Sequence, residues 1–229
     1  MDTTNFNSLE KTKAQSFEEL FEQHGALAFE KQFLLSEVIG ENHWQFDMNA
    51  GCISFGQELV FPVQVIGSLS FGDNSWMWGW ANTQSGIPEN LLEQSNALKA
   101  LGEKLNIQEL TEAHFAVGDN FEHKIGMIAS GLFGASSYYL ANYGKGTLVV
   151  TIQSDQIPDV NYNYPEKIFT TFPQLIGSID INHREAFKNY LIDRGFQLKT
   201  DAHSIEGLKD GKTVRAEFDE QGRLTHLSN

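Results

Sequence analysis

The sequence predicts an α+β fold in which helices pack on an antiparallel sheet, with a smaller C-terminal α+β unit. Three observations predict this fold class. Residues 17–35 and 88–105 carry apolar side chains at the 3.6-residue spacing of amphipathic helices. Residues 43–82 instead contain short β-branched and aromatic runs separated by glycine and asparagine, as in an antiparallel meander. Residues 160–229 place helical patterns before three short strand patterns.

The chain divides into three predicted segments. Residues 1–15 are polar and are predicted to be mobile, residues 16–155 form the main α+β domain with a Trp-rich strand, and residues 156–229 form the small C-terminal unit. The 229 residues are 41% hydrophobic, so the chain can bury a sizeable core. A unit of about seventy residues is only marginally stable alone, so we expect it to dock on the main domain.

The first helix is predicted to begin at Phe17. Ser16 and Glu19 form a capping box, whose side chains satisfy free backbone N–H groups of the first turn. Gly25 weakens the middle of this helix. The predicted buried stripe comprises Phe17, Leu20, Phe21, His24, Leu27, Ala28, Leu34 and Leu35.

Four strands follow as a meander, and the fourth is the most informative segment of the chain. The first three are predicted at residues 44–48, 52–55 and 59–69. The fourth covers 76–80 and carries three of the four tryptophans at alternate positions, which predicts that their indoles share one face. Each indole brings roughly 150–250 Å² of surface. The strand therefore faces either a core or the wall of an aromatic pocket.

The remaining elements of the main domain follow from caps and turn residues. Pro88 is predicted to open a helix that continues to Leu105, and residues 111–117 form a short strand. Asp119 and Glu122 are predicted to cap a third helix. A hairpin then pairs residues 137–143 with 147–152 around Gly144-Lys145-Gly146.

The C-terminal unit follows a connector at residues 155–165. A short helix is predicted at 168–175, interrupted at Pro173, and Asn182 begins a firmer helix that Gly195 ends. Three strands complete the unit, with turns at Asp210-Gly211 and Gln221-Gly222. They are predicted at residues 204–208, 214–218 and 224–227.

The net charge of −14 is concentrated in the first part of the chain. Residues 1–159 hold 7 Lys, no Arg and 20 Asp or Glu, a net charge of −13, whereas residues 160–229 carry a net charge of −1. No arginine precedes Arg184, so nucleic acid and anionic membranes are excluded as predicted partners. A basic protein, or a neutral or cationic small molecule, suits this charge better. The alternative is that the charge only keeps the protein soluble.

The sequence contains no motif that names a reaction. The spacings of a nucleophile elbow, a P-loop, a dinucleotide-binding turn and a helical zinc site are all absent. Cys52 is the single cysteine and is interpreted as an inert core thiol rather than a nucleophile. No apolar run of 18 residues and no secretory signal is present. We therefore predict a cytoplasmic protein with no metal and no cofactor.

The remaining candidate site is the aromatic face itself. If its indoles lined a cleft, Trp76, Trp78 and Trp80 would form an apolar or cation-attracting wall, and Asn82 would offer an amide to orient a ligand. His43 and Trp44 belong to the same predicted meander and complete the candidate ligand-binding set. The alternative is that the three indoles are simply core.

The string Trp76-Met77-Trp78-Gly79-Trp80-Ala81-Asn82 resembles the Trp-x-Trp-x-Trp-Ala-Asn signature of a bacterial family of unknown function. In that family an N-terminal helix leads into strands that end in the signature, and a helix that begins with Ile-Pro follows, as Ile87-Pro88 does here. The resemblance covers residues 17–152. It implies a bacterial cytosolic setting and carries no activity, ligand or partner.

Two function hypotheses follow. The first is a non-catalytic acidic binding protein, for example an immunity-type neutraliser of a basic partner, which the net charge of residues 1–159 and the missing catalytic motifs favour. The second is a small-molecule-binding protein or enzyme that uses a Trp-lined pocket.

Overall fold

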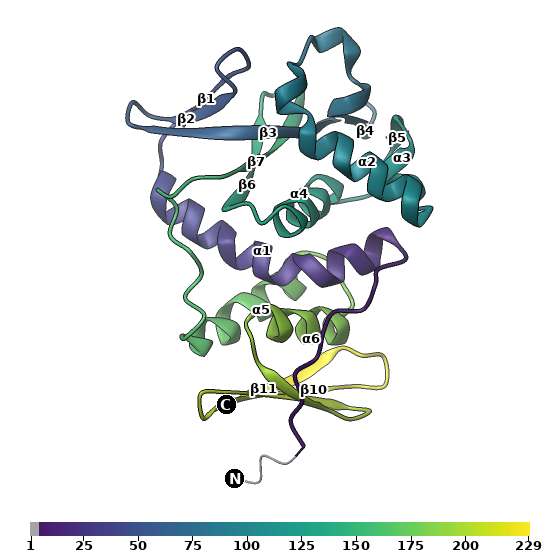
Figure 1. Ribbon diagram of the computed structural model, residues 1–229, viewed down its shortest axis with the longest axis vertical. Helices are drawn as coiled ribbons and strands as arrows, with labels where there is room; N and C mark the ends of the chain where they lie inside the picture. The colour runs from purple at the N-terminus through teal and green to yellow at the C-terminus, as the bar shows by residue number, and fades with distance from the viewer. Residues whose placement is uncertain (1–4) are drawn as a thin grey trace.

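The computed structural model describes residues 5–229 and confirms the predicted α+β fold class. A seven-stranded antiparallel sheet lies at one end of the molecule and a four-stranded antiparallel sheet lies at the other (Figure 1). Helix α1 (Phe17–Ile39) crosses the middle, with α4 on the side of the larger sheet and α5 and α6 on the side of the smaller one (Figure 1). The long first helix is therefore the central layer.

Helix α1 begins where the capping box predicts. The side chain of Ser16 accepts a hydrogen bond from the backbone N–H of Glu19 at 3.1 Å, and the carboxylate of Glu19 accepts one from the backbone N–H of Gln15 at 2.8 Å. The first contact satisfies a donor that the first turn leaves free, while Glu19 bonds the N–H of the residue before the cap rather than that of Ser16 itself. The helix continues through Gly25 without a break.

The larger sheet contains the predicted meander and hairpin. Strands β1 to β5 lie in chain order, β7 pairs with the long strand β3 on its other edge, and β6 pairs with β7. The strands are β1 (Trp44–Asp47), β2 (Cys52–Phe55), β3 (Leu59–Ser70), β4 (Ser75–Trp78), β5 (His114–Ala116), β6 (Ser137–Asn142) and β7 (Gly146–Ile152).

A bulge in β3 allows this sheet to bury both of its faces. Val65 pairs with Val150 but Gly67 pairs with Val149, so β3 contains one extra residue at that point. Side chains before the bulge, such as Val63, join one hydrophobic cluster, and Leu69 after it joins the other. The sheet therefore has apolar packing on both sides, which a regular alternation along β3 would not give.

After α1, the other α-helices within residues 16–155 are α2 (Glu93–Leu105), α3 (Gln108–Thr111) and α4 (Phe121–Leu132). The short helix α3 falls on residues that the sequence assigned to a loop and a strand. The predicted cap at Asp119 was wrong, because α4 begins after Asn120, whose backbone is left-handed with φ 62° and whose side chain makes no cap hydrogen bond. Asparagine tolerates this conformation better than most residues, which moves the start of the helix by one position.

The C-terminal unit forms two helices and four strands, one strand more than predicted. They are α5 (Ile168–Ser178), α6 (His183–Asp193), β8 (Gln197–Thr200), β9 (Ser204–Lys209), β10 (Lys212–Phe218) and β11 (Leu224–Ser228), and the sheet order is β11-β10-β9-β8. Strand β8 buries only Leu198, so its sequence carries no apolar alternation. Helix α5 is not interrupted at Pro173, because burial of Phe172 and Leu175 outweighs one missing backbone hydrogen bond.

Residues 5–15, part of the predicted mobile segment, run along the smaller sheet (Figure 1). Asn7 exchanges two backbone hydrogen bonds with Leu198 of β8, at 2.8 and 2.9 Å. The Lys11 ammonium lies 2.6 Å from a carboxylate oxygen of Asp193 at the end of α6. Residues 1–4 lie outside the described part of the chain.

A buried ion pair joins α1 to the end of α6. Arg194 Nη1 donates to both carboxylate oxygens of Glu30, at 2.7 and 2.5 Å, and the two residues are 0% and 5% exposed. The Tyr190 hydroxyl donates to the same carboxylate at 2.6 Å. Burial and the Glu30 charge raise the pKa of Tyr190, so its hydroxyl stays protonated as a donor. This cluster fixes the C-terminal unit against the central helix.

Candidate functional site

Trp76 and Trp78 belong to the core. Both are 0% exposed, and their rings meet edge to face with centroids 5.5 Å apart. The Trp78 indole donates to the backbone carbonyl of Glu109 at 3.1 Å, and Trp76 packs edge to face against Phe121 of α4. Neither ring reaches the surface, so the core alternative describes these two indoles.

Trp80 lies outside the strand, and the prediction of an extended backbone over 76–80 was wrong for this residue. Strand β4 ends at Trp78, and Gly79–Ala81 form a 3₁₀ turn. The turn presses Gly79 against its neighbours, since a Cβ there would lie 2.9 Å from Leu92 and 3.0 Å from the carbonyl of Val65. Trp80 is consequently only partly buried.

The remaining predicted site residues do not join the tryptophans. Trp44 packs in the cluster on the far end of β3, with its ring 6.5 Å from Tyr139, and His43 is exposed beside it. The register places Trp44 at the level of Leu59 and Trp78 at the level of Gly67, eight residues along β3. That separation is roughly 26 Å at the rise of a strand.

Asn82 has a local structural role. Its side-chain oxygen accepts a hydrogen bond from the backbone N–H of Ser85 at 3.3 Å and caps the short turn Thr83–Ser85. The predicted set of six residues is therefore dispersed into a core pair, a surface tryptophan, a cap and a distant hairpin.

An open hollow surrounds Trp80 on the surface of the main domain; we call it the Trp80 hollow. Its other lining residues are Glu89, Asn90, Leu92, Glu93 and Asn96. Glu89 and Glu93 are exposed, and the hollow holds no cationic side chain in its lining. The Lys99 ammonium lies 4.3 Å from the centroid of the Trp80 ring, an attractive cation–π geometry.

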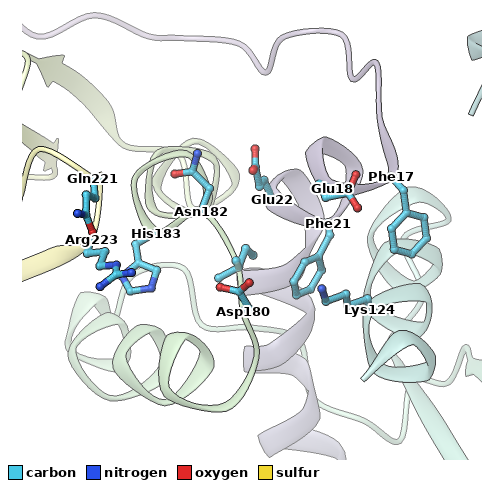
Figure 2. Close-up of a pocket in the computed structure, with 12 residues that line it drawn as sticks. Phe17, Glu18, Phe21, Glu22, Lys124, Asp180, Asn182, His183, Gln221 and Arg223 are labelled. Carbon is cyan, nitrogen blue, oxygen red and sulfur yellow. The ribbon is translucent and has the colours of Figure 1, made fainter. Parts of the chain in front are cut away.

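A second cavity lies where the C-terminal unit meets α1 and α4; we call it the junction cavity. Its volume is about 450 Å³. Figure 2 shows His183, Gln221 and Arg223 of the C-terminal unit on one side and Phe21 and Glu18 of α1 on the other. The full lining is Phe17, Glu18, Phe21, Glu22, Lys124, Asp180, Ile181, Asn182, His183, Gln221, Gly222 and Arg223.

The charges that line the junction cavity form no close ion pairs with each other. Three carboxylates (Glu18, Glu22 and Asp180) and two cations (Lys124 and Arg223) face it. None of them forms an ion pair within 4.0 Å of another described residue. The Lys124 ammonium instead lies 5.5 Å from the centroid of the Phe21 ring.

Glu22 is the most perturbed acid of this cavity. Burial, followed by the negative charges of Glu185, Glu19 and Glu18, raises the pKa of Glu22 from 4.5 to about 7. Perturbed carboxyl groups in a cleft are typical of functional sites, although structural clusters perturb pKa values as well. At neutral pH this carboxyl is poised between its two protonation states.

His183 lies across the junction cavity from α1, and a hydrogen bond fixes the orientation of its ring. Its Nδ1 accepts a hydrogen bond from the backbone N–H of Leu224 at 3.0 Å, so the ring proton of the neutral imidazole lies on Nε2. Burial lowers the pKa of His183, which favours that neutral form. The side chain can therefore donate a hydrogen bond from Nε2.

The raised pKa of Glu22 predicts a stability change with pH. The carboxyl binds its proton more tightly in the folded protein, so its stabilising contribution is complete below pH 4.5 and is lost as the pH rises through about 7. We expect Glu22→Gln to raise the free energy of unfolding at pH 8 by about 1 kcal/mol, because solvent screens this partly exposed group. That gain corresponds to a rise in Tm of roughly 2–4 °C. The two proteins should melt alike at pH 4, as measured by circular dichroism.

The control for this measurement is Glu37→Gln, which removes an exposed carboxylate from the same helix. It should leave Tm unchanged relative to the parent at both pH values. A Glu22→Gln variant whose Tm difference is equal at pH 4 and pH 8 would contradict the raised pKa.

Sequence reasoning missed the junction cavity because its lining comes from four separate segments. These are the start of α1, Lys124 of α4, residues 180–183 and residues 221–223. The sequence signals that exist there concern structure alone: Asn182 caps α6, and Gln221-Gly222 forms a turn. The packing of both α4 and α6 on α1 brings them together.

Among known proteins, the similarity found is confined to residues 18–155. A family model described as "Family of unknown function (DUF6882)" matches residues 18–155. The chain belongs to this family. No curated protein and no solved structure matches the chain. The DUF6882 match confirms the predicted resemblance to a family of unknown function and extends over α1 to β7.

The two surface features relate differently to the DUF6882 region. The Trp80 hollow lies entirely inside it, whereas the junction cavity also takes residues 180–183 and 221–223 from outside it. Across residues 5–229, no helix is long and apolar enough to cross a membrane. The same residues contain no cluster of three or more metal-ligating side chains.

Proposed function

We propose that this DUF6882 protein is a non-catalytic acidic binding protein of the bacterial cytoplasm, whose partner is a basic protein segment, as for an immunity-type neutraliser. One observation carries the proposal: Trp80 lies in an open hollow beside the exposed carboxylates of Glu89 and Glu93. An aromatic ring flanked by carboxylates is the chemical complement of a lysine or arginine side chain.

The segment around the Trp80 hollow carries an excess of negative charge, which also favours a basic partner. Residues 89–112 contain five glutamates against two lysines, and Glu103 and Glu112 are exposed. A surface of one sign attracts an oppositely charged partner over about a Debye length, ~8 Å at physiological salt. Binding would therefore weaken as salt rises.

Lys99 supports the proposed use of the Trp80 ring. Its ammonium already lies 4.3 Å from the ring centroid, so this indole accepts a cation within the protein itself. A partner lysine or arginine would bind the carboxylates of the hollow and compete with Lys99 for the ring.

The alternative function, a small-molecule-binding protein or enzyme that uses a Trp-lined pocket, has less support. Trp76 and Trp78 are 0% exposed and offer no wall to a ligand. Only Trp80 is left, in an open hollow that encloses a small molecule poorly and suits the side chain of a larger partner better.

The test is a titration of the protein with an oligolysine peptide, followed by tryptophan fluorescence. We expect binding at low salt that weakens strongly at ~0.15 M salt. Glu93→Gln should weaken binding by roughly twofold to fivefold, the effect of one exposed ion pair of ~0.5–1 kcal/mol. Trp80→Phe should weaken binding and remove most of the fluorescence change.

A matched control separates the hollow from the general charge. Glu103→Gln removes another exposed carboxylate from α2 but does not touch the hollow, so its effect should be clearly smaller than that of Glu93→Gln. Equal effects of the two variants, or no binding at low salt, would refute the proposed site.

A further inference from the structure

We infer that the junction cavity is a binding site for a small zwitterion, a molecule of amino-acid or dipeptide size with one ammonium and one carboxylate group. This inference is independent of the proposed function, because the cavity and the Trp80 hollow share no lining residue. The cavity is half open to solvent, carries both signs of charge in its lining, and shows no ion pair between those charges among the described residues.

Charges of opposite sign lie on different walls of the junction cavity. Lys124 and Arg223 approach the cavity from α4 and from the turn between β10 and β11, while Glu18 and Glu22 approach from α1 (Figure 2). An ion pair between exposed side chains gains only about 0–1 kcal/mol, so a ligand charge can compete with it at little cost. Here the described residues show no such pair within 4.0 Å, so both signs stay available to a ligand.

This arrangement of charge matches a bipolar molecule. A ligand ammonium would be attracted by the carboxylates of Glu22, Glu18 and Asp180, and a ligand carboxylate by Arg223 and Lys124. A purely anionic ligand would meet three carboxylates, and a purely cationic ligand would meet two cations. Only a molecule with both charges gains from both sets at once.

The junction cavity also has a neutral hydrogen-bond donor, an apolar part and a volume that suit such a ligand. The Nε2–H of His183, fixed by the bond from Leu224 to Nδ1, supplies a neutral donor beside Arg223 (Figure 2). Phe17, Phe21 and Ile181 give the cavity an apolar part. Its volume of about 450 Å³ lies in the range of small-molecule sites and accommodates an amino acid or a dipeptide.

Glu22 also gives the site a dependence on pH. Its carboxylate faces Glu18 and Glu19 on α1 and Glu185 and Lys188 on α6, and burial together with the three acids raises its pKa to about 7. An ammonium group binds the ionised form best. The affinity for a zwitterion should therefore rise between pH 6 and pH 8 in the parent protein. In Glu22→Gln the affinity should not change over this pH range.

The experiment is a thermal-shift screen of the full chain with the common amino acids and a set of dipeptides, each at millimolar concentration. We expect at least one zwitterion to raise Tm by a few degrees, as a ligand that binds only the folded state does. The N-acetylated and the amidated forms of the strongest binder each lack one charge, so each should bind at least tenfold more weakly by calorimetric titration.

Variants then locate the binding. Arg223→Gln and Glu22→Gln should each weaken the strongest binder roughly twofold to fivefold, the effect of one solvent-accessible ion pair, while Arg215→Gln, an exposed arginine of β10 outside the cavity, and Glu37→Gln should leave its affinity unchanged. Three results would overturn the inference: no zwitterion shifts Tm, blocked forms bind as well as the parent molecule, or the cavity variants bind normally. Because none of these variants alters the Trp80 hollow, oligolysine binding reports on the proposed function separately.

Discussion

Arg194→Ala is expected to lower the free energy of unfolding by ~3–5 kcal/mol, the typical cost of removing one partner of a buried ion pair. The substitution leaves the Glu30 carboxylate, 5% exposed, without the Nη1 donor that binds both of its oxygens. It also removes the donor to the carbonyls of Asn161 and Tyr164, which Arg194 Nη2 binds at 3.0 and 2.8 Å. Domains are stable by only about 5–15 kcal/mol, so this loss is a large fraction of the total.

Urea unfolding followed by circular dichroism measures this effect. The control is Arg215→Ala, which breaks ion pairs to Glu206 and Glu217 that are exposed to solvent and should cost ~0–1 kcal/mol. The double variant Glu30→Gln with Arg194→Met should recover a substantial part of the loss, because no buried charge is left unpaired. Equal losses for Arg194→Ala and Arg215→Ala would show that the cluster does not fix α6 to α1.

The fold could be predicted wherever one segment carries its own signal. The capping box at Ser16 and the apolar stripe behind it determine α1 locally, and the hairpin around Gly144-Lys145-Gly146 follows from turn chemistry. Strand β8 could not be predicted, because its stability comes from pairing with β9 and from Asn7, both outside the segment. Helix α5 runs through Pro173 for a similar reason: tertiary burial overrides a local preference.

The candidate sites were predictable only in part. Alternate spacing correctly places Trp76 beside Trp78, but the turn at Gly79 depends on contacts with Leu92 and Val65 that no local pattern reveals. The sequence therefore identifies Trp80 as a candidate site residue but does not predict which residues surround it in the hollow. The junction cavity has no signal in any one segment, because its charges meet only when the C-terminal unit packs against the DUF6882 region.

The three clustered tryptophans should differ sharply when each is replaced by alanine. Trp76→Ala and Trp78→Ala should each lower the free energy of unfolding by ~3–5 kcal/mol, as truncation of a fully buried large aromatic does. Trp78→Ala also removes the donor to the Glu109 carbonyl. The space left by Trp76 is difficult to refill, since its ring lies directly on Gly67, where even a Cβ would come within 2.4 Å of it.

Trp80→Ala is the internal comparison, because the same residue type lies two positions further along but is only partly buried. It should cost less than half as much as the other two in urea unfolding, since the transfer term scales with the area removed from water. Acrylamide should quench the parent protein more than Trp80→Phe, whose remaining indoles of the cluster are sealed in the core. If Trp80→Ala destabilised the protein as much as Trp76→Ala, this ring would be a core residue after all, and its part in binding a basic partner would lose its physical basis.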